Sequence, residues 1–196
     1  MSCTTLDLYK SILKCAGQRY MPGIRPKVYF ILKENIVAWP SVVDEVTTDM
    51  GDIAKTSGNF SLAASKKWQR LDLVDLKSNF HSASQGEAPS KTYLNTVTLV
   101  VGGTGEEITG FMKAANNDAL VYLVQQRDGK FRLVGNAAFD VDTSCEQESG
   151  ANITDNAQTT VSLSVTDDCP FPFYTGKIET ADDGDISGVD GSAMAA

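Results

Sequence analysis

Short apolar segments bounded by polar turn residues dominate the pattern of this 196-residue chain. The run Val28–Leu32 is apolar at every position and has the length of a strand, which predicts a strand covered on both faces. The polar residues 33–35 and the apolar run Ile36–Trp39 then predict a second strand that completes a hairpin and ends at Pro40. The first forty residues therefore indicate a β-rich fold.

A change of register marks the next predicted strand, over residues 68–76. Leu71 and Leu73 follow one two-residue alternation, whereas Val74 and Leu76 follow the opposite one. Because a shift by one residue moves every side chain to the other face of a sheet, this pattern predicts a bend or bulge between residues 73 and 74. Such bends occur where a sheet curls toward closure.

The second half of the chain predicts five more strands and one helix. A strand over residues 91–101 is followed by an amphipathic helix at about residues 105–116, introduced by a segment with capping-box spacing, Thr104–Glu107. Strands at 120–124 and 131–134 flank an Asp-Gly turn and predict a tight hairpin. The remaining strands are expected at 159–165, where Ser162 and Ser164 alternate outward with buried valine and leucine, and at 173–178.

Polar or irregular segments separate and flank these elements. Residues 44–59 and 78–90 predict long polar links, and residues 179–196, acidic and rich in small side chains, predict a disordered tail. Residues 1–26 predict either a short helix over 5–16 or an arm that orders only on a neighbour. Residues 27–178 are then expected to form a single β-rich domain.

The acidic residues are concentrated in the second half of the chain. The net charge is −8, with 12 basic and 9 acidic residues up to residue 91, and 5 and 16 after it. This balance disfavours tight binding of DNA, RNA or anionic membranes, which need clustered Lys and Arg. No apolar run reaches the length of a membrane span and no secretory signal is present, so a soluble protein made in a cytoplasm is expected.

No arrangement of residues typical of catalysis stands out, and we expect no enzyme activity and no cofactor. The glycine-rich turn 101–105 lacks the lysine of a phosphate-binding loop, and Glu106 and Glu107 follow it where a phosphate would bind. The single histidine, His81, lies in a predicted polar link without an orienting partner. Asp140, Asp142, Glu146 and Glu148 lack the glycine and terminal glutamate of a calcium loop, which favours a solvated acidic surface.

The four cysteines show no zinc-ligand spacing. They lie at positions 3, 15, 145 and 169, and the chain contains no C-x-x-C pair. Free thiols are expected in a reducing compartment, with a disulfide between Cys145 and Cys169 as the open alternative.

Three segments in the second half carry a family resemblance. Residues 120–135 combine a strand, an Asp-Gly-Lys turn and an aromatic-x-Leu-x-Gly strand. An acidic link, the strand 159–166 and a Pro-x-Pro-x-Tyr-x-Gly segment at 170–176 follow. In this order, residues 90–178 resemble the tail tube proteins of tailed bacteriophages.

The resemblance implies a mainly β fold, a β-sandwich or half-open barrel with one flanking helix, whose subunits join their inner sheets into a ring. Rings of this kind, including those of short-tailed phages, form the channel through which the genome leaves the capsid. The expected partners are other copies of the chain in a hexamer or dodecamer, neighbouring tail or head-tail connector proteins, and DNA that passes without tight binding. The expected location is the virion tail, after assembly in the host cytoplasm.

This interpretation selects two sets of candidate residues. An acidic, polar lumen would let DNA slide because like charges repel, and the lumen-facing candidates are Asp140, Asp142, Glu146, Glu148, Ser162 and Ser164. Long irregular segments in a domain are commonly functional, so subunit contacts are expected in the two polar links and the N-terminal arm, with Trp39, Phe80, His81 and Tyr174 as candidates.

A different class of function stays open at this point. A β-sandwich binding module, such as a capsid decoration or a host-surface carbohydrate-binding protein, would use exposed aromatic side chains as platforms. The candidates for that role are Trp39, Trp68 and Tyr174, although core or interface packing is the simpler interpretation of the two tryptophans.

Overall fold

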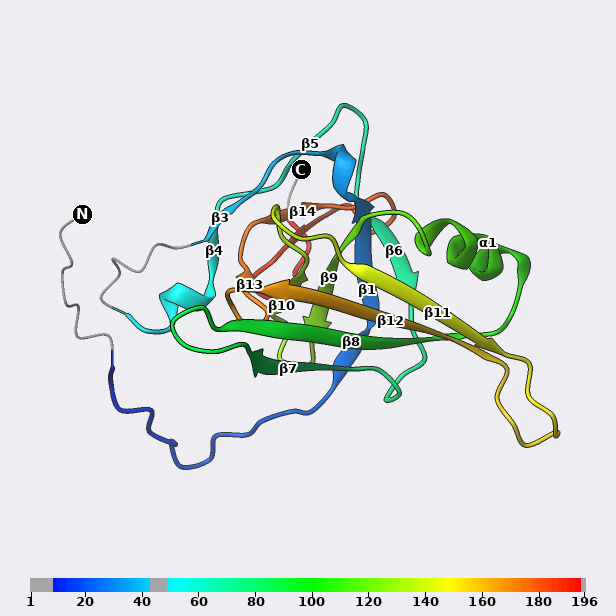
Figure 1. The fold of residues 1–196 in the computed structure, drawn as a ribbon, viewed down its shortest axis with the longest axis horizontal. Coiled ribbons are helices and arrows are strands. Elements are labelled where there is room, and N and C mark those ends of the chain that lie inside the picture. The colour runs from blue at the N-terminus through cyan, green and yellow to red at the C-terminus, as the bar shows by residue number, and fades with distance from the viewer. Residues whose placement is uncertain (1–8, 43–48, 195–196) are drawn as a thin grey trace.

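Two antiparallel sheets packed face to face form the body of the molecule (Figure 1). A computed structural model describes residues 9–42 and 49–194. The five-stranded sheet has the order β13-β10-β9-β1-β6, with β13 (Phe173–Tyr174), β10 (Phe131–Val134), β9 (Leu120–Gln126), β1 (Ile24–Leu32) and β6 (Gln69–Asp72). The four-stranded sheet has the order β11-β12-β8-β7, with β11 (Asp142–Glu148), β12 (Gln158–Asp167), β8 (Thr92–Gly102) and β7 (Asn79–Gln85). The predicted mainly β fold, a β-sandwich with one helix, is confirmed.

Smaller elements cover the outside of this sandwich. The α-helix α1 (Glu106–Ala115) lies on its flank, as predicted. Three two-stranded ladders pair β2 (Ile36–Ala38) with β5 (Ser61–Leu62), β3 (Ser41–Val42) with β4 (Thr56–Ser57), and β14 (Lys177–Glu179) with β15 (Asp185–Ser187). Two short 3₁₀ turns occur at Lys33–Asn35 and Asp52–Ala54.

The five-stranded sheet is the central layer, because both of its faces are buried. On one face Val28, Tyr122 and Val124 pack toward the four-stranded sheet. On the other face Tyr29 and Leu123 belong to a second cluster. A strand between two apolar layers has no polar side, which explains the uninterrupted apolar runs in β1 and β9.

The C-terminal segment builds that second cluster and contradicts the prediction of a disordered tail. Ile178 and Ile186 face each other across β14 and β15, and both are buried in the cluster. Asp183 pairs with Arg70 at 2.8 Å and accepts a hydrogen bond from the Tyr29 hydroxyl at 2.7 Å. Asp183 is therefore paired with a distant basic residue, whereas Glu179 and Asp185 both pair with the nearby Lys177. Residues 179–194 belong to the folded body; residues 195–196 lie outside the described range.

The prediction of a polar link over residues 78–90 is also wrong, because seven of these residues form strand β7. Strand β7 pairs with β8 along its whole length, and its Phe80 and Ser82 point inward while His81 points outward. The sequence of β7 alternates between inward and outward positions, but Phe80 is its one large apolar side chain. The pattern of hydrophobic residues alone therefore indicates a loop. Residues 49–59 of the other predicted link hold a 3₁₀ turn and β4, and residues 44–48 lie outside the described range.

Two predicted strand pairings differ from the structure. The predicted hairpin of residues 28–39 does not form, because the 3₁₀ turn after β1 redirects the chain and β2 pairs with β5. The single strand predicted at 173–178 is instead β13 and β14, which belong to different ladders. By contrast, the β9–β10 hairpin is confirmed, and Gly129 supplies a φ of +100° in its turn.

The predicted bend at residues 73–74 is the point at which the chain crosses between the sheets. The Leu73 amide donates to the Pro26 carbonyl beside the five-stranded sheet, and the next amide, of Val74, donates to the Val100 carbonyl of β8. The change of register between Leu73 and Val74 thus marks the step from one sheet to the other, whereas Leu76 is exposed.

The start of α1 and the start of the folded domain also differ from the predictions. Gly105 occupies the N-cap position of α1 without a side-chain hydrogen bond, so the predicted capping box with Thr104 does not form. Residues 9–23 are an exposed irregular arm rather than a helix, and the first buried residue from position 9 onward is Ile24, three residues before the predicted start of the domain. Residues 5–8 of the predicted helix lie outside the described range.

One buried carboxyl group opposes the stability of the fold at neutral pH. Asp167, at the end of β12, is 6% exposed, and its Oδ2 atom has no hydrogen-bond partner among the described residues. Burial, assisted by the neighbouring Asp168, raises the pKa of Asp167 to about 6. The folded state therefore binds a proton more readily than the unfolded state between about pH 4 and pH 6, and the ionised form lowers stability above pH 6.

We predict that Asp167→Asn raises the free energy of unfolding at pH 7.5 by about 1 to 3 kcal/mol, because it removes a buried charge with an unpaired oxygen. The gain should disappear below pH 4, where the wild-type carboxyl is protonated in both states. Urea denaturation across pH 3.5–8 measures this. Asp118→Asn, at an exposed position, is the control and should change little; a destabilised Asp167→Asn protein at pH 7.5 would refute the argument.

We also predict that Ile178→Ala lowers the free energy of unfolding by about 2 to 5 kcal/mol, as for other fully buried isoleucines. The same substitution at Ile153, which is fully exposed, should leave stability within about 0.5 kcal/mol of the wild type. Thermal and urea unfolding of both variants provide the comparison. Equal stability of the two variants would mean that the C-terminal segment is not part of the folded core.

Candidate functional site

Polar side chains form two adjacent rows across the outward face of the four-stranded sheet. Strand register places two rows of side chains across all four strands, in the order β11, β12, β8 and β7. The first row is Asp142, Ser164, Thr96 and His81, and the second is Ser144, Ser162, Thr98 and Asn79. We call these two rows, together with Glu146 and Glu148 of β11, the polar face.

The charged side chains of this sheet are all acidic. Its four strands contain no Lys or Arg at any position, and β11 supplies three carboxylates to the polar face. The inward face of the same sheet is apolar and includes Leu99 and Leu163. The sheet thus has one face that packs and one that presents hydroxyls and carboxylates to water.

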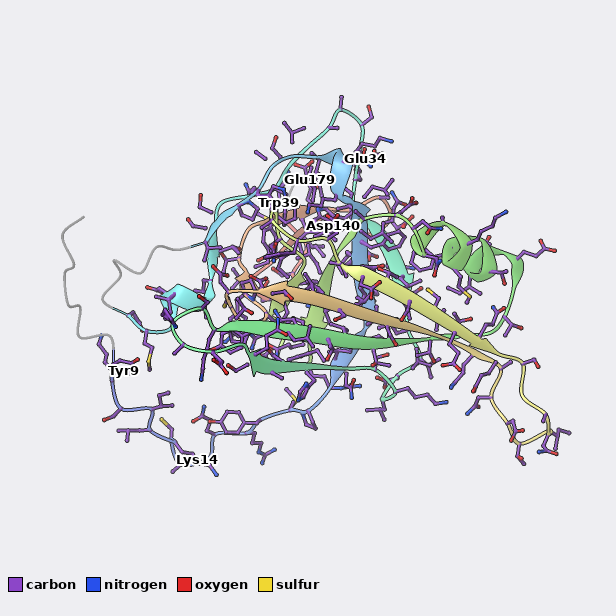
Figure 2. All side chains as sticks on the ribbon, in the orientation of Figure 1. Tyr9, Lys14, Glu34, Trp39, Asp140 and Glu179 are labelled. Carbon is purple, nitrogen blue, oxygen red and sulfur yellow. The ribbon has the colours of Figure 1, made fainter. Side chains whose placement is uncertain are left out.

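Five of the six residues predicted to face a lumen lie together on this polar face. Asp142, Glu146 and Glu148 occupy alternate outward positions of β11, beside Ser164 and Ser162 of β12. Asp140 does not join them, because it precedes the strand and pairs with Lys33 Nζ at 2.7 Å near the end of β1 (Figure 2). The strand register, which the sequence showed only for β12, decides this grouping.

The four residues predicted to make subunit contacts lie in three different environments. His81 is exposed on the polar face, and Phe80 points the other way, against the Phe171 ring at 5.1 Å. Trp39 is half-buried with its ring 5.4 Å from that of Phe60. Tyr174 is only 1% exposed and donates a hydrogen bond to the Lys177 carbonyl at 2.7 Å, so its prediction as a surface contact is wrong.

The burial of aromatic residues also bears on the carbohydrate-binding alternative. Trp68, like Tyr174, is 1% exposed and packs in the cluster behind the five-stranded sheet. A buried ring cannot stack on a sugar. Of the three proposed platforms, only Trp39 retains an accessible surface.

Both edges of the four-stranded sheet have one unpaired side. In the backbone ladders β7 pairs only with β8, and β11 pairs only with β12, over seven residues in each case. The Gln147 side chain of β11 also hydrogen-bonds to Thr109 of α1. An edge strand presents unpaired amide and carbonyl groups that are suited to pairing with another chain. The polar face is therefore bounded on two sides by strands that can extend the sheet.

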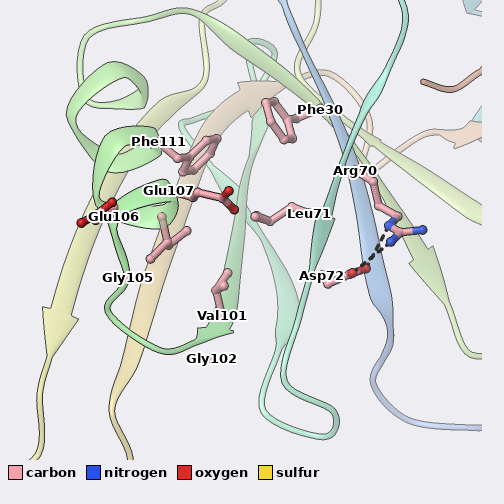
Figure 3. A pocket seen from close by; sticks show the side chains of 11 residues that line it. Phe30, Arg70, Leu71, Asp72, Val101, Gly102, Gly105, Glu106, Glu107 and Phe111 are labelled. Atoms are coloured by element: carbon pink, nitrogen blue, oxygen red, sulfur yellow. Dashed lines mark hydrogen bonds and ion pairs between the residues drawn. The ribbon is translucent and has the colours of Figure 1, made fainter. Parts of the chain in front are cut away.

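A second surface feature is a cleft of about 750 Å³ between α1, β6 and the end of β8 (Figure 3). Its floor is apolar and consists of the half-buried side chains of Phe30, Leu71, Val101 and Phe111. The first turn of α1 forms one wall, and there the Glu107 carboxylate points over the floor, whereas Glu106 points away from it.

Acidic groups set the charge of this cleft. The only basic group in its lining, Arg70, is bound by two carboxylates, of Asp72 at 3.1 Å and Asp183 at 2.8 Å. Neither Glu106 nor Glu107 forms an ion pair with a described residue. The cleft thus combines an apolar floor with negative charge, which opposes phosphate binding at the N-terminus of the helix.

The reactive residue types are dispersed. Across residues 9–42 and 49–194, no three His, Cys, Asp or Glu side chains lie close enough to hold a metal ion. Cys15, Cys145 and Cys169 are free, and burial raises the pKa of the Cys145 thiol and that of Cys169, the latter to about 11. Cys3 lies outside the described range.

Comparisons with known proteins add no relative: no family model, no curated protein and no solved structure matches the chain. In the described part of the chain, α1 is too short to cross a membrane.

Proposed function

We propose that this protein is a structural subunit of a bacteriophage tail, a tail tube or tail ring protein that forms homo-oligomeric rings around a channel for the genome. The observation that carries the proposal is the four-stranded sheet, which has a polar face free of Lys and Arg and an open strand at each edge. The resemblance of residues 90–178 to tail tube proteins supports the same role. The role requires no catalytic step and no cofactor.

Edge-to-edge pairing gives a physical route to the ring. If β7 of one subunit pairs with β11 of the next, both open edges of each sheet are satisfied by a single repeated contact. Such a contact joins two different surfaces of the same chain, so it closes into a ring when the rotation between subunits divides the circle evenly. A closed ring then leaves no exposed edge in the sheet.

The polar face is the side of the sheet that we assign to the channel. Hydroxyls of Ser162, Ser164 and Thr96 are uncharged and hydrated, and the carboxylates of β11 repel phosphate. A basic surface would release counterions from DNA and hold it tightly. A channel with the composition of the polar face would let DNA pass without being held.

We predict that purified protein, or the virion that contains it, shows rings or tubes with a central channel in negative-stain electron microscopy. Assembly should depend on protein concentration, because each contact joins two copies. A protein that remains monomeric at high concentration, in a virion whose particles contain no ring of this subunit, would contradict the proposal.

We further predict that Ser162→Lys with Ser164→Lys makes assembled rings retain double-stranded DNA at low salt, while wild-type rings do not. Each added lysine can neutralise one phosphate, so the binding should weaken steeply as salt increases. Co-sedimentation of rings with DNA measures the effect. Ser149→Lys, at an exposed position in the loop after β11, is the control; equal DNA retention by the two lysine variants would place the polar face outside the channel.

A further inference from the structure

The N-terminal arm, residues 9–23, is an exposed apolar segment. Its five large apolar side chains are between 63% and 91% exposed, and they are Tyr9, Ile12, Leu13, Tyr20 and Met21. In Figure 1 the arm leaves the lower end of β1 and runs away from the side of the body that carries α1. Single exposed apolar residues are common, but five within thirteen positions mark a contact surface.

The charge of the arm is opposite to that of the body. Residues 9–25 contain four basic residues and no acidic one, whereas the remainder of the chain is strongly acidic. Lys14 follows the apolar pair Ile12 and Leu13 directly. A partner for this segment therefore needs an apolar floor next to carboxylates.

The cleft between α1, β6 and β8 has that chemistry. Phe30, Leu71 and Phe111 provide half-buried apolar surface, and Glu107 extends over it without an ion-pair partner (Figure 3). Its volume of about 750 Å³ is in the range of cavities that enclose a ligand of several side chains. Seating Ile12 and Leu13 on the floor would place a lysine next to a carboxylate.

On the basis of the ring-forming function proposed above, we infer that residues 9–16 of one subunit bind in the cleft of a second copy of this chain. Residues 9–23, when extended, span about 50 Å, enough to reach a neighbouring subunit. The arm and α1 lie on opposite sides of the body in Figure 1, which suits a contact between copies. Apolar burial supplies the affinity, and the lysine and the glutamate set the orientation.

A charge exchange in the full-length protein tests this contact. Lys14→Glu and Glu107→Lys should each weaken self-association about fivefold, since each replaces an attraction with a repulsion, and the double variant should restore it. Glu106→Lys is the matched control, because that side chain lies in the same helical turn but points away from the floor. Sedimentation velocity over a range of concentrations gives the association constants, and circular dichroism checks folding.

A separate substitution tests the apolar part of the contact. Leu13→Asp should weaken association about tenfold or more, because it replaces an apolar side chain buried in the contact with a charged one. Its side chain is exposed within the subunit, so the fold should be unaffected. Unchanged association in Leu13→Asp and in both charge variants would overturn the inference.

Cross-linking separates this inference from the proposed function. A photoreactive amino acid at position 13, in a mixture of isotopically heavy and light protein, should give heavy–light cross-links to peptides of β6 or α1. Rings that form without such cross-links, or with cross-links only within one copy, overturn the docking of the arm and leave the ring proposal intact. Heavy–light cross-links in dimers that never form rings support the docking and contradict the ring.

Discussion

The burial of the five-stranded sheet on both faces is the constraint on which the rest of the structure depends. Over residues 28–32 of β1 and 120–124 of β9 neither face is polar, so the sheet folds only when two separate layers cover it. The four-stranded sheet covers one face. The C-terminal ladder, with Trp68 and Phe60, covers the other.

This arrangement determines what the four-stranded sheet can offer to other molecules. One of its faces is used in packing against β1 and β9, so the opposite face is the one in contact with water. Two rows of polar side chains and the carboxylates of β11 lie on that face, and the strands that bound it are unpaired on their outer sides. The four-stranded sheet therefore combines a polar face, acidic side chains and two open edges. For this reason we assign both the assembly and the channel to it.

Features set by local pattern could be predicted from the sequence. The helix at 105–116, the β9–β10 hairpin with Gly129 and the alternation in β12 depend on neighbours within a few residues. The bend at residues 73–74 was visible as a change of register, although its meaning, a crossing between sheets, required the structure.

The features that the sequence did not reveal depend on distant partners. Ile178 and Ile186 look isolated among acids until they meet across β14 and β15, and Asp183 looks solvated until Arg70 and Tyr29 reach it. β7 has one large apolar residue, so only its pairing with β8 defines it. The burial of Tyr174 depends on the cluster behind the five-stranded sheet, and nothing in its own segment of the sequence indicates that layer.

The grouping of residues on the polar face also depends on partners that are distant in the sequence. Asp142 and Ser164 belong to different segments of the sequence, and the β11–β12 register puts them opposite each other. Asp140, two residues away, leaves the group because Lys33 holds it near β1. His81 joins the group because β7 pairs with β8 and places it opposite Thr96.

The most direct test of the central claim is a cryo-electron microscopy reconstruction of the assembled protein at a resolution that separates strands. The account predicts a ring in which β7 of each subunit lies beside β11 of the next, with Ser162 and Ser164 facing the axis. A ring with the four-stranded sheet on its outer surface, or with subunits joined through other elements, would contradict it.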